Sequence, residues 1–262
     1  MESRMDGRVA LITGASMGLG KAMALKFAGA GAKVALLARR PDVLAEAKAE
    51  VAKSGAKVEA YSCDVSDKAA LEATWAKVVA DFGQVDVLVN NAGASAAKPF
   101  ESVTDAEWES DFAIKLWPAI RLCRLAFPGM KQRRWGRIIN VLNTYAKTPG
   151  ANTAPTSVSR AAGMALTKVL AGEGAPHNVL VNALLVGLID SDQWMRRYKQ
   201  NPGTNKSYRE YLDEFAKARN LPIGRLGEAE EFANAACFLA SDSGSYINGV
   251  AINVDGGMSP VV

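Results

Sequence analysis

Three glycines at positions 14, 18 and 20 stand in the segment TGASMGLG, which begins at Thr13. An apolar run at 8–13 leads into this segment, and a helical pattern at 19–30 begins at its end. Glycine lets the backbone turn sharply and approach a pyrophosphate, which can rest on the unpaired N–H groups of the following helix. Since a strand and a helix flank the loop, as this motif requires, the spacing predicts a dinucleotide site. The expected loop contacts are Gly14, Ser16, Met17, Gly18, Leu19 and Gly20.

The residues after the second predicted strand bear on which dinucleotide binds. Ala38 is followed there by Arg39 and Arg40, with no acidic residue between them and Pro41. A carboxylate at this position binds the ribose 2′-hydroxyl of NAD, whereas arginine forks match the oxygens of a 2′-phosphate. The sequence therefore favours NADP over NAD. The alternative is that both arginines are simply solvated.

Strand and helix patterns alternate along the chain, and they predict an α/β fold. Continuous apolar runs such as 34–38 are typical of parallel strands that are buried on both faces. The predicted strands are 8–13, 33–38, 57–62, 85–89, 137–142, 179–185 and 250–254. The predicted helices are 19–30, 41–54, 67–82, 105–130, 157–173 and 228–240. We expect a single domain over 1–262, a Rossmann-type doubly wound parallel sheet with helices on both faces.

The stretch 190–227 is expected to be irregular and to act as a substrate lid. It lies between the sixth strand and the last long helix, and ligands of such sheets bind beyond the carboxyl ends of the strands. Composition excludes several other classes of function. The net charge of +4 is dispersed, which gives no argument for nucleic-acid binding. No apolar run approaches eighteen residues and no signal segment is seen, so we expect a cytoplasmic protein without membrane spans.

The three cysteines, Cys63, Cys123 and Cys237, show no metal-ligand spacing, and we expect reduced core residues and no metal site. The predicted helices 105–130 and 157–173 carry apolar residues such as Trp117, Leu122 and Val169. We expect these side chains, with Leu116 and Met164, to be exposed and to form a two-fold interface, which gives a homodimer or homotetramer.

Several motifs in this order resemble the short-chain dehydrogenase/reductase family over essentially the whole chain. They are the glycine loop at 13–20, Asp64-Val65, Asn90-Asn91-Ala92-Gly93 and Asp255-Gly256-Gly257. The resemblance implies that Asp64 and Val65 border the adenine and that Asn91, Ala92 and Gly93 border the ribose. It also implies that the segment 186–191, with Ile189 and Ser191, runs beside the nicotinamide amide. This chain has Val186-Gly187 where the family usually has Pro-Gly.

The catalytic residues that the resemblance implies are absent. The family uses Asn, Ser, Tyr and Lys: the tyrosine protonates the substrate carbonyl, and the lysine lowers the tyrosine's pKa and holds the ribose. The corresponding positions of this chain hold Lys115, Asn143, Thr156 and Arg160. No tyrosine elsewhere in the chain is followed by lysine four residues later. The usual proton transfer therefore cannot operate here.

The replacements suggest a different proton donor. A threonine hydroxyl does not ionise in the accessible range, and Arg160 stays protonated, so neither replaces the tyrosine alone. Asn143 can hydrogen-bond a carbonyl oxygen. A lysine near the fixed charge of Arg160 has a lowered pKa, so Lys115 can donate the proton; Tyr145, just past a strand end, is the other candidate. The alternative, without a catalytic role, is that Lys115 points to water in a chain that has lost its catalytic residues.

Two functional hypotheses follow. The first is an NADP-dependent oxidoreductase that acts on a small carbonyl or hydroxyl substrate with an atypical proton donor. The second is a catalytically silent dinucleotide-binding protein or scaffold. A non-redox relative such as a halohydrin dehalogenase ranks last, because those relatives keep the tyrosine and lose the glycine loop, whereas this chain does the opposite.

Overall fold

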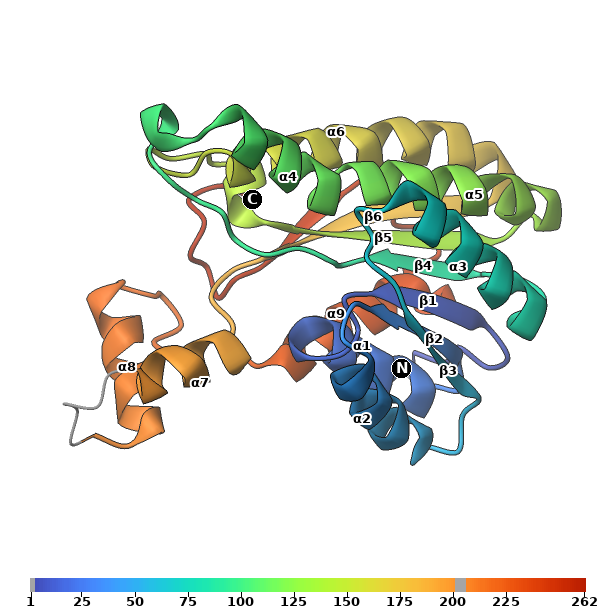
Figure 1. Ribbon diagram of the computed structural model, residues 1–262, viewed down its shortest axis with the longest axis horizontal. Coiled ribbons are helices and arrows are strands. Elements are labelled where there is room, and N and C mark those ends of the chain that lie inside the picture. The colour runs from blue at the N-terminus through green and yellow to red at the C-terminus, as the bar shows by residue number, and fades with distance from the viewer. Residues whose placement is uncertain (1–2, 201–205) are drawn as a thin grey trace.

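The computed structural model describes residues 3–200 and 206–262, and a parallel sheet of seven strands forms its centre (Figure 1). The strand order is β3-β2-β1-β4-β5-β6-β7. The chain therefore winds outward in both directions from β1 and β4, which confirms the predicted doubly wound sheet. The strands are β1 Val9–Thr13, β2 Lys33–Ala38, β3 Val58–Ser62, β4 Val87–Asn90, β5 Gly136–Asn143, β6 Val179–Val186 and β7 Ala251–Val254.

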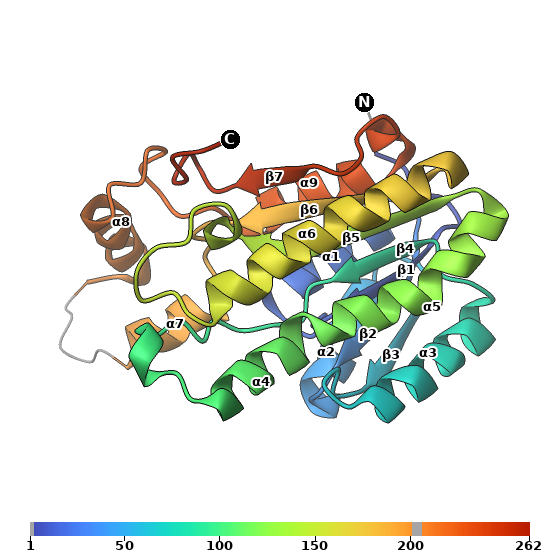
Figure 2. The ribbon, with the colours of Figure 1, turned by 90° about the horizontal axis from the view of Figure 1, so that it is seen from above.

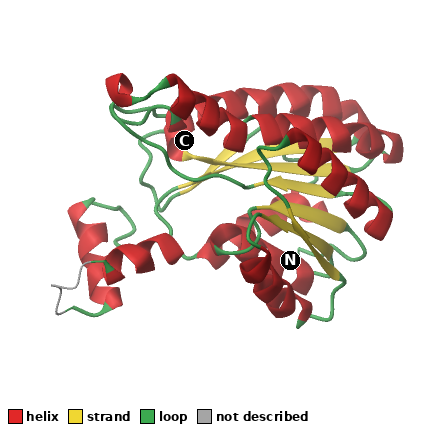
Figure 3. Cartoon of the chain, in the orientation of Figure 1, coloured by secondary structure: helices red, strands yellow, loops and turns green. Residues whose placement is uncertain are grey.

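Helices cover both faces of the sheet (Figures 2 and 3). One face packs on α1 (Gly18–Gly29), α2 (Pro41–Ala52) and α9 (Ala229–Ala240), whose buried residues share one apolar cluster. The other packs on α3 (Lys68–Phe82), α5 (Trp117–Arg133) and α6 (Thr156–Gly174). All strands are parallel, so their carboxyl ends lie at one edge of the sheet, and the loops that follow them can build a common site.

The predicted helix 105–130 is wrong as a single element. The structure has α4 over Asp105–Lys115 and α5 over Trp117–Arg133, separated at Leu116. Pro118 lies in the first turn of α5. Proline has no N–H for the carbonyl one turn earlier, and its ring crowds that carbonyl, so Pro118 favours a break before α5. The break leaves Lys115 as the last residue of α4.

The stretch 190–227 is not irregular, contrary to the sequence-based expectation. It contains α7 (Asp192–Lys199) and α8 (Tyr208–Ala218), which stand beyond the end of β6 (Figure 1); residues 201–205 of the predicted lid lie outside the described residues. Ser207 and Glu210 form a capping box at the start of α8. Apolar residues of the segment, Trp194, Leu212, Ala216, Leu221 and Leu226, form a small cluster of their own. This local burial explains why the segment is helical.

Candidate active site

The glycine loop between β1 and α1 is closely packed against the end of β4. A Cβ on Gly20 would lie 2.2 Å from the Gly14 carbonyl oxygen, and Gly14 itself has a φ of +65°. The Asn91 amide Nδ2 donates to the carbonyls of Thr13, at 2.9 Å, and Gly14, at 3.2 Å. The Thr13 hydroxyl accepts the N–H groups of Asn91 and Ala92. The loop and the segment at 91–93 are therefore held together as one unit.

The start of α1 is suited to bind an anion. Within the described residues no side chain caps this helix, and its first turn holds no acidic residue. Its first N–H groups, at Gly18, Leu19 and Gly20, therefore face the loop without a competing carboxylate, and the helix dipole favours a negative group there. Glycine at the loop positions leaves room for a pyrophosphate to approach the backbone. The geometry fits the predicted dinucleotide.

Two arginines lie beside this loop, at the end of β2. The Arg40 guanidinium contacts the Met17 sulfur at 3.4 Å, and the Arg39 Nη1 lies 4.0 Å from the Asp64 carboxylate. Both side chains are exposed, and Asp64 is exposed beside them while Val65 is buried. The structure thus brings Arg39, Arg40, Met17 and Asp64 to one side of the glycine loop. A phosphate on the adenosine ribose would meet two positive charges at this place.

Two of the four substituted positions, Lys115 and Thr156, are in contact, together with one residue that the sequence analysis missed. The Lys115 ammonium donates to the Thr156 hydroxyl at 3.0 Å and is ion-paired with Asp111. The Lys115 and Asp111 side chains are 2% and 1% exposed. The Thr156 hydroxyl also accepts the Ala96 N–H at 2.9 Å. Lys115 is thus directed into a buried polar cluster, and the interpretation that it points to water is wrong.

Arg160 lies next to this cluster, beside Gly93. Its Nη1 donates to the Val141 carbonyl at 2.9 Å. A Cβ on Gly93 would lie 2.8 Å from the Arg160 Nη2 and 3.3 Å from the Lys115 Cγ, so the two side chains border that glycine together. Burial lowers the pKa of Arg160 to about 10, while the charge of Asp111 acts to raise it. Because this pKa is still well above 7, the side chain stays cationic at neutral pH.

The pKa of Lys115 is lowered, but not chiefly for the predicted reason. Burial of the ammonium is the first cause, and the charge of Arg160 adds to it. The hydrogen bond and the charge of Asp111 act in the opposite direction. Asp111 precedes Lys115 by one helical turn on α4, and this spacing of an acid four residues before a lysine was the signal in the sequence that could have found it.

Other predicted site residues lie around the same edge of the sheet. Asn143 ends β5, and its buried Oδ1 has no hydrogen-bond partner among the described residues. Tyr145 lies in the short helix Thr144–Ala146 and is 38% exposed. Beyond β6, Ile189 is buried and bridges to Gly227, while the Ser191 carbonyl accepts the Trp194 N–H at the start of α7. The unpaired oxygen of Asn143 is available to a ligand hydroxyl or amide.

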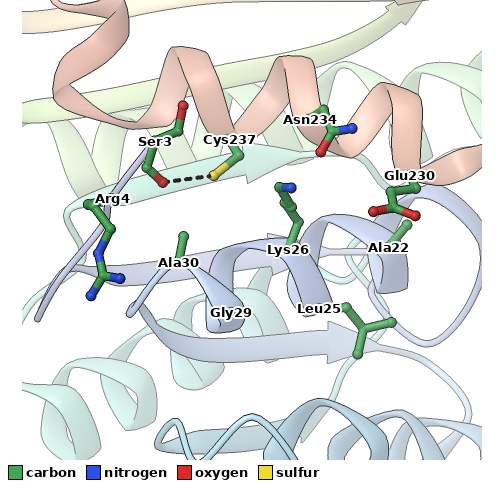
Figure 4. Close-up of a pocket in the computed structure, with 10 residues that line it drawn as sticks. All are labelled: Ser3, Arg4, Ala22, Leu25, Lys26, Gly29, Ala30, Glu230, Asn234 and Cys237. Atoms are coloured by element: carbon green, nitrogen blue, oxygen red, sulfur yellow. Dashed lines mark hydrogen bonds between the residues drawn. The ribbon is translucent and has the colours of Figure 1, made fainter. Parts of the chain in front are cut away.

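A cavity of about 150 Å³ opens beside the cluster, between α4 and the segment at 94–98; Asp111, Lys115, Ser95 and Ser110 are among its lining residues. A second cavity, of about 720 Å³, lies between α1 and α9 near the N-terminal segment (Figure 4). Its lining contains none of the predicted site residues, and Cys237 there donates to the Ser3 carbonyl. We therefore place the site at the sheet edge, not in this second cavity.

The described part of the chain contains no group of three or more His, Cys, Asp or Glu side chains that could hold a metal ion. Cys63, Cys123 and Cys237 are free and buried. Across residues 3–200 and 206–262, no helix is both long and apolar enough to cross a membrane.

A parallel sheet wound from its centre, with a glycine loop and an uncapped helix start at its carboxyl edge, defines a dinucleotide-binding α/β protein. A family profile described as enoyl-(acyl carrier protein) reductase matches residues 14–259. The chain is 34% identical over 254 residues to the 3-oxoacyl-[acyl-carrier-protein] reductase of Escherichia coli K12, covering 97% of this chain and 98% of that protein. The chain belongs to the short-chain dehydrogenase/reductase family, as its motifs indicated.

Two solved structures resemble this one closely. The L-sorbose reductase of Gluconobacter frateurii, complexed with NADPH and L-sorbose, has a TM-score of 0.94 and 34% identity, with full coverage of both chains. A short-chain oxidoreductase of Pseudomonas aeruginosa PAO1, bound to NADPH and described as containing an atypical catalytic center, has a TM-score of 0.92 and 32% identity. That match covers 99% of each chain.

Proposed function

We propose that this protein is an NADP-dependent oxidoreductase that interconverts a small carbonyl compound and its alcohol, with Lys115 as the source of the proton. The observation that carries the proposal is the hydrogen bond of 3.0 Å from the Lys115 ammonium to the Thr156 hydroxyl, beside Gly93. Relatives that bind NADPH support the cofactor, and one of them combines NADPH with an atypical catalytic center. A turnover assay with NADPH over a panel of carbonyl compounds tests the proposal.

The cofactor would be held by the loop at 14–20, with its phosphates on the start of α1 and its adenosine half beside Arg39, Arg40 and Asp64. Arg160 and the segment at 91–93 would border the nicotinamide half, with Ile189 and Ser191 opposite them. When bound, NADPH supplies a hydride to a carbonyl carbon. The remaining task of the protein is to deliver a proton to the carbonyl oxygen.

Thr156 would pass this proton on. Its oxygen accepts hydrogen bonds from the Ala96 N–H and from Lys115, so its own O–H remains to donate to a substrate oxygen. As the hydroxyl gives its proton to the developing alkoxide, the Lys115 ammonium gives one to the threonine oxygen. The substrate leaves as an alcohol, Thr156 is unchanged, and Lys115 is left neutral until water reprotonates it. The Asn143 amide would bind the substrate beside them.

The second hypothesis, a dinucleotide-binding protein without turnover, also has a specific observation in its favour. Lys115 is held in a buried ion pair with Asp111, so its charge is balanced in the protein without any substrate. Tight NADPH binding without reduction of any compound in the carbonyl panel would support this hypothesis and reject the first.

We expect the preference for NADPH to depend on Arg39 and Arg40. Replacing both with glutamine should weaken NADPH by about 2–3 kcal/mol, roughly 30- to 150-fold, because two charge-assisted contacts to a 2′-phosphate are lost. Binding of NADH should change little, because it lacks that phosphate. Titration by tryptophan fluorescence measures both affinities.

The matched control for this pair is Lys33→Gln with Lys53→Gln. It removes the same charge from the opposite ends of β2 and α2, where both lysines are exposed. Its NADPH affinity should stay within about twofold of the parent, since exposed charges at that distance are screened by salt. Equal weakening of NADPH and NADH in the arginine variant would show that the assignment to the 2′-phosphate is wrong.

We also propose a homodimer or homotetramer with α5 and α6 at an interface. Trp117, Val158 and Val169 are 49%, 46% and 58% exposed on these neighbouring helices (Figure 2). The sequence-based inclusion of Leu122 is wrong, because that side chain is fully buried against the sheet.

Sedimentation at micromolar concentration should give at least twice the chain mass of 27.8 kDa. The variant Trp117→Glu with Val169→Lys should shift the protein toward monomers, because charges would replace exposed apolar contacts. The matched control Val262→Lys changes an exposed valine at the chain end and should leave the mass unchanged. A parent protein that sediments as a monomer contradicts the proposal.

The segment 190–227 remains our proposed substrate lid. The Tyr208 hydroxyl on α8 donates to the Asp190 carboxylate, just after β6, and joins the helical segment to the strand end. A lid fixed at this point would lie over the same edge of the sheet as Ser191 and Ile189.

A further inference from the structure

Asp111 is a buried charge to which the proposed proton transfer gives no role so far. It lies on α4 one turn before Lys115, and these two residues are the buried residues of that helix. One carboxylate oxygen pairs with Lys115, and the other, Oδ2, is buried with no hydrogen-bond partner among the described residues. No group among the described residues replaces the water that this oxygen loses on burial.

Stability alone does not account for this arrangement. Taking two charges out of water costs several kcal/mol, and well-packed apolar residues in place of a buried ion pair are often as stable or more so. An apolar pair on α4 would also avoid the unsatisfied Oδ2. The cost of the pair points to a use for the charged lysine itself.

The other charges around Lys115 show what Asp111 does for it. From α6, the Arg160 guanidinium borders Gly93 together with Lys115 and repels its ammonium. At the cavity beside α4, Glu107 is ion-paired with Lys98 and thereby neutralised. Asp111 is the carboxylate in direct contact with the ammonium, and it acts against both burial and Arg160.

We infer that Asp111 is a positioning residue, which keeps Lys115 protonated and directs its ammonium toward Thr156. The two contacts of Lys115 divide its hydrogens between an acceptor on its own helix and the Thr156 oxygen on α6. With Asp111 present, the ammonium has a fixed place and its charge is balanced. The inference rests on the proposed function for its catalytic meaning, although the hold on the proton can be measured without turnover.

The small cavity lets the pair exchange protons with solvent. At about 150 Å³ it is large enough to admit water. Hydroxyls of Ser95 and Ser110 line it together with Asp111 and Lys115. The protonation of Lys115 should therefore follow the pH of the medium on the timescale of a titration.

The direction in which the pH profile of kcat shifts in Asp111→Asn follows from the charges around Lys115. A proton donor must be protonated, so reduction is retained below the pKa of Lys115 and lost as the pH rises through it. Burial already lowers this pKa, and removal of the Asp111 charge lowers it further. In Asp111→Asn the alkaline fall of kcat should begin about one pH unit or more below that of the parent, a tenfold change in the proton equilibrium. The affinity for NADPH should stay within about threefold.

The decisive measurement is an NMR titration of protein labelled with ¹³C at lysine Cε, with the Lys115 signal assigned from its loss in Lys115→Arg. We expect its pKa to fall by about one unit or more in Asp111→Asn. Glu107→Gln is the matched control, since Glu107 lies one turn away on the same helix beside the same cavity. Glu107→Gln should leave the pKa of Lys115 unchanged. Asp111→Glu should bring both this pKa and the pH profile of kcat back toward those of the parent.

An unchanged Lys115 pKa in folded Asp111→Asn overturns the inference, as does a kcat profile that falls in height without moving along the pH axis. If Asp111→Asn does not fold, the test is made on the parent protein. There the ¹³C carboxyl signal of Asp111 should inflect at the pH where Lys115 titrates. Absence of this inflection also overturns the inference. A parent that reduces no carbonyl compound rejects the proposed function, and the NMR titration then still decides whether Asp111 holds the proton.

Discussion

Lys115→Met should lower kcat for carbonyl reduction by about 10²- to 10⁴-fold, the usual contribution of a positioned acid. Methionine has a similar length and fills the same buried space, but it cannot give a proton to the Thr156 oxygen, which Lys115 contacts at 3.0 Å. The affinity for NADPH should change less than about fivefold, because the glycine loop and both arginines of the adenosine side are untouched. Single-turnover measurement of NADPH oxidation separates the chemical step from binding.

This variant needs a control for stability, because it leaves Asp111 as an unpaired buried charge. Such a charge costs about 3–5 kcal/mol. The double variant Lys115→Met with Asp111→Asn removes both charges, so it should melt closer to the parent and remain as inactive as the single variant. Tyr145→Phe should keep most of the activity. If Lys115→Met keeps the full rate and Tyr145→Phe loses it, Tyr145 is the proton donor and the lysine hypothesis is wrong.

Gly20→Ala should weaken NADPH binding by about 2 kcal/mol or more, at least roughly 30-fold, and destabilise the fold by about 1–3 kcal/mol. The added Cβ would lie 2.2 Å from the Gly14 carbonyl oxygen and 2.7 Å from the Asn91 amide nitrogen. The first of these is a backbone atom of the loop itself, so the loop must move to relieve the clash. Calorimetric titration with NADPH and thermal unfolding measure the two effects.

Gly29→Ala is the matched control on the same helix. A Cβ at Gly29 would meet nothing within 4 Å, so alanine should be tolerated or should stabilise α1 by up to about 1 kcal/mol through its helix propensity. Loss of NADPH affinity in Gly29→Ala as large as in Gly20→Ala would show that general disturbance of α1, and not the loop clash, is responsible.

The parts of this fold that could be predicted from sequence are those specified by local pattern. The run that became β2 is apolar at five successive positions and is buried throughout from Val34 to Ala38. The glycines at 14 and 20 were recognisable because a strand and a helix flank them. The break at Leu116 was missed because apolar periodicity continues across it, and its one local signal is Pro118, whose backbone lacks an N–H.

The sequence positions of the site residues could be predicted, but the contacts between their side chains could not. Alignment with the family placed Lys115, Thr156 and Arg160 at one site, although they lie on α4 and α6, far apart in the chain. What it could not give was the direction of the Lys115 side chain, because tertiary packing of α4 against α6 decides whether an end-of-helix lysine is buried. The partnership with Asp111 was visible as a spacing of four, yet such spacing also occurs in exposed pairs, for example Arg209 and Asp213.

The separation of α4 from α5 has a consequence for how the chemistry of such a chain can change. The inward residues of α4 are Asp111 and Lys115, whereas α5 contributes Leu122, Phe127 and other apolar side chains to the core. An eleven-residue segment thus carries the unusual acid–base pair while a neighbouring helix carries the packing. We expect that exchanging this segment would change the acid–base chemistry while the packing of α5 on the sheet is retained.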